Sequence, residues 1–227
     1  MNTNGARPQA QATGVQFFGK ISAAVSHDLK NVLAVINEKA GLLEDFCQMA
    51  QHGKPIDLER FDAVTAQVKG QVRRADKIIR GFNQFAHTTD HPVASIDLNA
   101  CIMNLVQLAQ RLLARLEVDV ALQPSATPVM VATRPLLAQE LIWAVIQWGA
   151  EHCAGTREIA IAAQLSDQGV GVRIDRLANL PPEKDCTPLV SATASLRKEL
   201  AADIQTDRDA GALKIRFTSL QSPQADP

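Results

Sequence analysis

The chain has 227 residues, 46% of them hydrophobic, which is enough apolar material for two small domains or one large one and excludes wholesale disorder. Its formal net charge of −1 gives no electrostatic reason to bind nucleic acid or an anionic membrane. No apolar run approaches the roughly 20 residues of a membrane-spanning helix, and the N-terminus lacks a basic-then-apolar signal pattern, so we expect a cytoplasmic protein.

Two long helices are predicted in the first part of the chain. Residues 1–13, rich in Gln, Ala, Asn and Gly, are expected to be disordered, and a helix follows over 15–51. A turn with Gly and Pro ends that helix, and Asp57 is a plausible N-cap for a second helix that continues to about His87. The short connection predicts an antiparallel helical hairpin, which we assign to residues 14–90.

The first predicted helix has an apolar stripe and, opposite it, a histidine. At about 100° per residue, His27 lies about 200° from Val25, a residue of the stripe. Asn31 lies one turn after His27 on the same open face, and Asp28 adjoins His27 in the sequence. His27, Asp28 and Asn31 are therefore our candidate catalytic residues. The stripe consists of Ile21, Val25, Leu29, Val32, Ile36 and Leu43.

The second predicted helix is also amphipathic. Apolar side chains recur along it at steps of three and four residues: Phe61, Val64, Val68, Val72, Ile79, Phe82 and Phe85. A hairpin alone cannot bury the stripes of both helices. The simplest remedy is for two copies to pair as a four-helix bundle, so we expect a homodimer.

An α/β domain is predicted after the hairpin. Residues 88–95 form a linker, the domain covers 96–219, and 220–227 are expected to be a disordered tail. The alternation of helical and strand patterns predicts an α/β sandwich with helices on one face of a mixed sheet. In chain order, we expect a helix over 96–116, strands over 118–122 and 129–131, a helix over 135–153, strands over 159–163 and 171–175 around a turn at 167–169, a helix over 188–202, and strands over 204–206 and 213–217.

The segment from His27 to Asn31, on a long helix that a second matching helix follows, resembles the phosphoacceptor box of bacterial two-component histidine kinases and histidine phosphotransferases. In that family the histidine carries a phosphoryl group on a ring nitrogen. Residues 73–80 resemble the family's basic segment that faces the histidine. The resemblance covers about residues 15–218, and it implies an α+β fold in which a dimerising hairpin precedes a kinase-like ATP-binding sandwich.

The positions that match the family's ATP-binding motifs have lost several of the required residues. Ala144 and Trp148 stand where the family has asparagines for magnesium and phosphates. Asp175 is kept in the adenine box, but Leu177 and Asn179 replace both of its glycines, and the segment that matches the glycine-rich lid has no glycine. The sandwich domain is therefore degenerate, and we expect it to bind neither ATP nor another cofactor.

A phosphoacceptor without kinase machinery resembles histidine phosphotransferases built from a degenerate kinase core. This resemblance implies a phosphorelay in which His27 takes a phosphoryl group from one receiver aspartate and passes it to another. The implied partners are response-regulator receiver domains, which bring their own Mg²⁺, and a hybrid histidine kinase is a further candidate.

The chemistry of the three site residues leaves several functions open. Imidazole is nucleophilic near neutral pH because its unperturbed pKa is about 6.5, and Asp28 can hold the second ring nitrogen of His27 and stabilise the developing cation. Asn31 can instead position a water molecule, which gives a response-regulator phosphatase. A non-catalytic scaffold that binds a receiver or a kinase is a third reading, and an active kinase with divergent boxes is a fourth.

The cysteines indicate no further chemistry. Cys47, Cys101, Cys153 and Cys186 are widely spaced and form no CxxC pair. We therefore expect no metal site and no disulfide framework, but reduced thiols.

Overall fold

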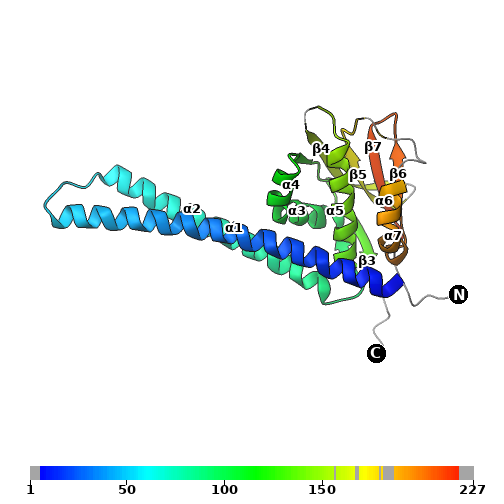
Figure 1. The fold of residues 1–227 in the computed structure, drawn as a ribbon, viewed down its shortest axis with the longest axis horizontal. Helices are drawn as coiled ribbons and strands as arrows, with labels where there is room; N and C mark the ends of the chain where they lie inside the picture. The colour runs from blue at the N-terminus through cyan, green and yellow to red at the C-terminus, as the bar shows by residue number, and fades with distance from the viewer. Residues whose placement is uncertain (1–5, 156, 167–168, 179, 181–186, 220–227) are drawn as a thin grey trace.

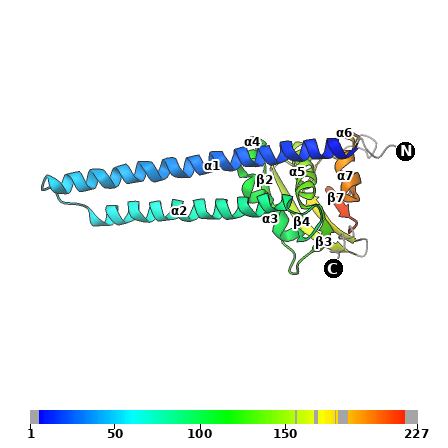
Figure 2. The ribbon, with the colours of Figure 1, turned by 90° about the horizontal axis from the view of Figure 1, so that it is seen from below.

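The computed structural model describes residues 6–155, 157–166, 169–178, 180 and 187–219. A long helical hairpin extends from one side of an α/β domain (Figure 1). The hairpin consists of α1 (Ala6–Gln51) and α2 (Leu58–Ala86), which lie side by side and antiparallel (Figure 2). The predicted fold class, a helical hairpin followed by an α/β sandwich, is confirmed. Pairing of two hairpins into a four-helix bundle stays a prediction.

The tip of the hairpin has the cap that the sequence indicates. Asp57 is the N-cap of α2, and its Oδ1 accepts a hydrogen bond of 3.1 Å from the backbone N–H of Arg60. Just inside the tip, the rings of Phe46 and Phe61 lie 6.2 Å apart and join the two helices.

The beginning of α1 differs from the expectation. The helix begins at Ala6, so residues 6–13 are helical, whereas the composition predicts disorder over 1–13. Ala, Gln and Arg are strong helix formers, and they extend the long helix that follows them toward the N-terminus. Residues 1–5 and the expected tail 220–227 lie outside the described part of the chain.

The α/β domain follows the hairpin without a long connection. Its elements are η1 (His87–Thr89), β1 (Ala94–Asp97), α3 (Leu98–Leu108), α4 (Gln110–Arg115), β2 (Asp119–Leu122), β3 (Met130–Thr133), α5 (Pro135–Glu151), β4 (Glu158–Ser166), β5 (Gly169–Asp175), α6 (Thr187–Ala192), α7 (Ala194–Leu200), β6 (Ala202–Asp207) and β7 (Ala212–Phe217). Residues 167–168 of the predicted turn, Asn179 and Cys186 lie outside the described residues.

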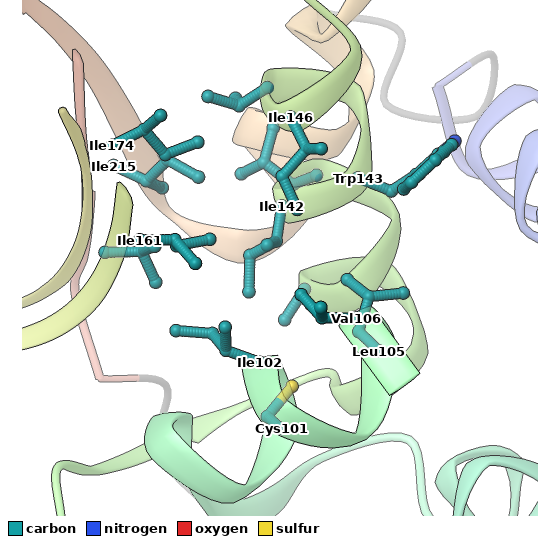
Figure 3. Close-up of a cluster of buried hydrophobic side chains, with 14 of the residues drawn as sticks. Cys101, Ile102, Leu105, Val106, Ile142, Trp143, Ile146, Ile161, Ile174 and Ile215 are labelled. Atoms are coloured by element: carbon teal, nitrogen blue, oxygen red, sulfur yellow. The ribbon is translucent and has the colours of Figure 1, made fainter. Parts of the chain in front are cut away.

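A mixed five-stranded sheet forms one layer of this domain. Its strand order is β2-β4-β5-β7-β6, with β2 parallel to β4 and the other pairs antiparallel. Ile161, Ile174 and Ile215 point from the sheet toward the helices and meet Ile142 and Ile146 of α5 (Figure 3). The helices therefore cover one face of the sheet, as the alternating pattern predicts.

Three segments differ from their predicted form. Residues 94–97, expected in the linker and at a helix start, form β1, which pairs antiparallel with β3 as a separate two-stranded sheet. The single helix predicted over 96–116 is interrupted at Ala109, where φ is −91° and ψ is 6°. A similar interruption at Thr193 separates α6 from α7. In each case tertiary packing overrides a continuous local pattern.

The base of α1 belongs to the core of the α/β domain. Phe17, Ile21 and Val25 are buried in the same cluster as the side chains of α5. Trp143 of α5 points toward the ribbon of α1 (Figure 3). The domain itself thus covers part of the stripe that the sequence analysis left for a second copy. In the described part of the chain, no helix is both long and apolar enough to cross a bilayer.

Candidate functional site

His27 lies on α1 at the level where this helix passes α4 of the α/β domain. Its side chain is 42% exposed, whereas the helical pattern predicts an open face. The difference arises because α4 packs beside this part of α1, which helical periodicity cannot reveal. The imidazole is therefore accessible from one side and contacted from the other.

The structure brings the two predicted neighbours to one ring nitrogen of His27. Asn31 Nδ2 lies 3.2 Å from His27 Nδ1, and Asp28 Oδ1 lies 3.9 Å from the same atom. With the amide turned about its χ2 axis, Asn31 presents its oxygen to Nδ1–H instead, so this side chain can serve either tautomer of the ring. Both α1 neighbours thus face Nδ1 and leave Nε2 to partners from elsewhere.

A cation that the sequence pattern did not indicate completes the site. Nη1 of Arg111, on α4, makes hydrogen-bond contacts with both ring nitrogens of His27. Arg111 and His27 are 84 positions apart in the chain, so no spacing rule connects them. The available signal was the amphipathic pattern around Leu113, which is buried and lies about 200° from Arg111 on a helix.

The basic segment of α2 lies elsewhere. Arg80 pairs with Asp76 at 2.9 Å, and both side chains are mostly exposed. Arg73, Arg74 and Lys77 are exposed as well. Among the described hydrogen-bond and ion-pair partners of His27, the positive charge comes from α4 and not from this segment.

The positions that match the nucleotide motifs are engaged in contacts of their own. The ring of Trp148 stacks on that of His152 with centroids 3.9 Å apart. The Asp175 carboxylate accepts a hydrogen bond of 2.6 Å from Arg173 Nε, which also forms an ion pair with it. Ala144 has no group that can bind a metal or a phosphate.

Backbone contacts hold the segment that corresponds to the first glycine-rich box. Leu177 is buried, and its N–H donates to the carbonyl of Gly211 at 2.9 Å. Ala178 N–H donates to the carbonyl of His152 at 2.7 Å. A Cβ on Gly211, whose φ is +58°, would lie 2.6 Å from the Leu177 oxygen, so this turn and the box are in close contact.

Burial changes the titration of one carboxyl group at the contact between α1 and α5. Burial raises the pKa of Glu140 above its usual value of 4.5, while a hydrogen bond with Thr13 and the charge of Lys20 act against that rise. Glu140 is not a described partner of His27. It lies where α5 of the domain packs on α1. In the described residues, no three His, Cys, Asp or Glu side chains are grouped closely enough to hold a metal ion.

Neither the protein-family models nor the curated proteins include a match to this sequence. Solved structures are similar at low identity. The Acinetobacter baumannii histidine kinase AdeS is 14% identical, over 81% of this chain and 96% of that one, with a TM-score of 0.46. A bacterial phosphotransferase is 16% identical, over 87% and 94%, with a TM-score of 0.43. The histidine kinase ThkA, in complex with the response regulator TrrA, is 14% identical, over 94% and 66%, with a TM-score of 0.45.

Proposed function

We propose that this protein is a histidine phosphotransferase, which relays a phosphoryl group between receiver aspartates through His27 and does not use ATP. The observation that carries the proposal is the environment of His27: a half-exposed imidazole with Asn31 and Asp28 at Nδ1 and a cation beside it. This arrangement suits a nucleophile that must accept, hold and release an anionic group.

The contacts at the nucleotide-motif positions support the ATP-independent part of the proposal. Asp175, the residue kept from the adenine box, is already paired with Arg173. The Leu177 side chain packs against Gly149: a Cβ added to Gly149 would lie 3.4 Å from Cδ2 of Leu177. A nucleotide would have to displace buried apolar and ion-paired groups, and each such rearrangement costs free energy.

The transfer step follows from the two ring nitrogens. With the proton on Nδ1, where the Asn31 oxygen and the Asp28 carboxylate are available, Nε2 carries the lone pair. Nε2 attacks the phosphorus of an aspartyl phosphate, the N–P bond forms, and the P–O bond breaks with its electron pair leaving on the aspartate carboxylate. The ring becomes cationic while Nδ1 keeps its proton, and Asp28 stabilises that charge. Receiver domains, which supply Mg²⁺, are the proposed partners, and a hybrid histidine kinase is the proposed source.

A phosphatase is the second candidate function. Asn31 is exposed and lies 3.2 Å from the imidazole, so a receiver docked at His27 would also bring its aspartyl phosphate near this amide. An amide that orients water there would release phosphate from the receiver without a phosphohistidine intermediate.

One labelling experiment separates these functions. The purified protein is mixed with a receiver domain carrying a radiolabelled phosphoryl group, and the label is followed with time. A relay transfers the label to the protein as an acid-labile, base-stable adduct, and His27→Ala abolishes this transfer. Asn31→Ala keeps the labelling and slows the release of free phosphate.

Two other results would contradict the relay. Release of phosphate by the His27→Ala protein at the wild-type rate indicates the phosphatase. Binding of the receiver without any movement of label indicates a scaffold. Calorimetry with magnesium and a nonhydrolysable ATP analogue checks the remaining point, because micromolar affinity would indicate a kinase with divergent boxes.

A further inference from the structure

The cation at His27 comes from the α/β domain and not from the hairpin. Arg111 lies on α4, a short helix that begins after the interruption at Ala109. Ala109 and Leu113 are both buried, which anchors α4 to the core and directs the opposite side of the helix toward α1. The packing of the domain therefore fixes the position on α4 from which the Arg111 side chain extends toward His27.

In the unphosphorylated protein, Arg111 is a donor to the nucleophile. Nη1 of Arg111 contacts both ring nitrogens, and because a guanidinium has N–H donors and no acceptor, the ring nitrogen without a proton accepts from it. This contact holds the imidazole on one side of α1 and occupies the nitrogen that would attack phosphorus. Arg111 must therefore move aside when a phosphoryl group approaches Nε2.

The charges near His27 balance before phosphorylation and not afterwards. The His27 imidazole lies between one carboxylate, Asp28, and one guanidinium, Arg111. A phosphoryl group on Nε2 adds nearly two negative charges on the side away from Asp28. Of the described partners of His27, Arg111 is the one that can neutralise them, and a guanidinium matches phosphoryl oxygens with two parallel N–H donors.

We propose that Arg111 is the phosphoryl-binding residue of this site, which exchanges its contact with the His27 ring for contacts with the phosphoryl oxygens. The proposal rests on the proposed function of His27 and adds a role for the degenerate domain. That domain presents a cation to the histidine of the hairpin.

Spectroscopy of the phosphorylated protein tests this role without any receiver. Phosphoramidate labels histidines directly, and the His27→Ala protein identifies the ³¹P signal that belongs to His27. Because a neighbouring cation favours the dianion, the ³¹P signal of the wild type should titrate at lower pH than that of Arg111→Ala, by about one pH unit. Arg111→Lys should lie between the two, since it keeps the charge and loses the second donor.

Transfer kinetics supply the second measurement. Arg111→Ala should slow transfer from a phosphorylated receiver by about 10²–10³-fold, as loss of a charge-stabilising donor does elsewhere. Arg115→Ala is the matched control, because Arg115 is exposed on the same helix, and it should transfer at the wild-type rate. Circular dichroism checks that each variant is folded.

The two readouts separate the two proposals. An unchanged ³¹P titration in the Arg111→Ala protein overturns the role of Arg111, whatever the relay does. A wild-type protein that shows the shifted titration but takes no label from any receiver overturns the relay and leaves the phosphoryl-binding role of Arg111 standing.

Discussion

Glu140 is a carboxyl group held between α5 and α1, and burial raises its pKa above 4.5. Because the folded state binds this proton more tightly than the unfolded state, the free energy of unfolding falls as pH rises from about 4.5 through the raised pKa, and is constant above it. Glu140→Gln should remove this slope and raise stability near pH 7 by on the order of 1 kcal/mol. Urea unfolding at pH 4.5 and pH 7.5 measures both effects.

The control is Glu151→Gln, because Glu151 is exposed at the end of the same helix. This variant should show the wild-type pH dependence of unfolding. If the Glu140→Gln protein keeps the wild-type slope, another group is responsible for it.

Cys101 is predicted to be the least reactive of the described thiols. Burial raises the pKa of Cys101 to about 12, so its thiolate is scarce at pH 8. Cys47 is exposed on the hairpin and should react with an aromatic disulfide reagent within minutes. Peptide mapping of the product should show Cys47 modified and Cys101 protected until denaturant is added. Equal modification of both would show that the core around α3 opens readily.

At the residue scale, the proximity of Asn31 to His27 was predictable and the contact with Arg111 was not. Side chains four positions apart on a helix are neighbours whatever the rest of the chain does, so the His27–Asn31 distance follows from the helix alone. The Arg111 contact requires α4 to be packed against α1, which depends on the whole α/β core. The catalytic roles of His27, Asp28 and Asn31 stay predictions.

At the scale of elements, a glycine-to-alanine substitution should have opposite effects on stability at two positions. A Cβ at Gly171 in β5 would lie 2.2 Å from the backbone oxygen of Ile215 in β7, so Gly171→Ala must force the strands apart and should destabilise by about 1–3 kcal/mol. A Cβ at Gly70 in α2 meets nothing within 4 Å. Gly70→Ala should stabilise by about 0.5–1 kcal/mol, because alanine favours the helix.

Thermal unfolding of these two variants beside the wild type gives the comparison directly. A Gly171→Ala protein that melts with or above the wild type would mean that β5 and β7 are not paired as closely as described.

Most elements were predictable from periodicity, and the exceptions share a cause. The helices of the hairpin and α5 are long, Asp57 caps the start of α2, and Pro135 begins α5, so local pattern and tertiary packing agree. β1 is four residues long and exists because β3 pairs with it, a contact between distant segments. The interruption at Ala109 lies inside a pattern that reads as continuous helix, and the residues at and after it, Ala109 and Leu113, are buried in the core of the domain.

At the scale of the whole molecule, one side of the hairpin stays apolar and uncovered in the single chain. Leu33, Val72 and Ile79 are 61%, 53% and 46% exposed. At about 100° per residue these side chains share one side of the antiparallel pair, away from His27. They therefore form the surface that we expect a second copy to bury, since apolar burial contributes about 25 cal/mol per Å².

Ile79→Asp should weaken the homodimer, because it places a charge in the apolar contact. Sedimentation velocity at micromolar concentration should show a shift from dimer to folded monomer. Leu165→Asp, near the end of β4 and also exposed to solvent in the single chain, should stay dimeric. Phe82 is less suitable for this test, because its ring packs against Phe18 within the same chain. A wild-type monomer would contradict the four-helix bundle.

The burial of the base of α1 among residues of α5 also constrains biosynthesis. Phe17, Ile21 and Val25 emerge from the ribosome well before α5, the helix that covers them. Contacts between such distant segments form slowly, and apolar surface that waits for its partner is prone to aggregate. A nascent chain interrupted before α5 is complete therefore yields an aggregation-prone fragment, not an independent hairpin that could compete with the full protein.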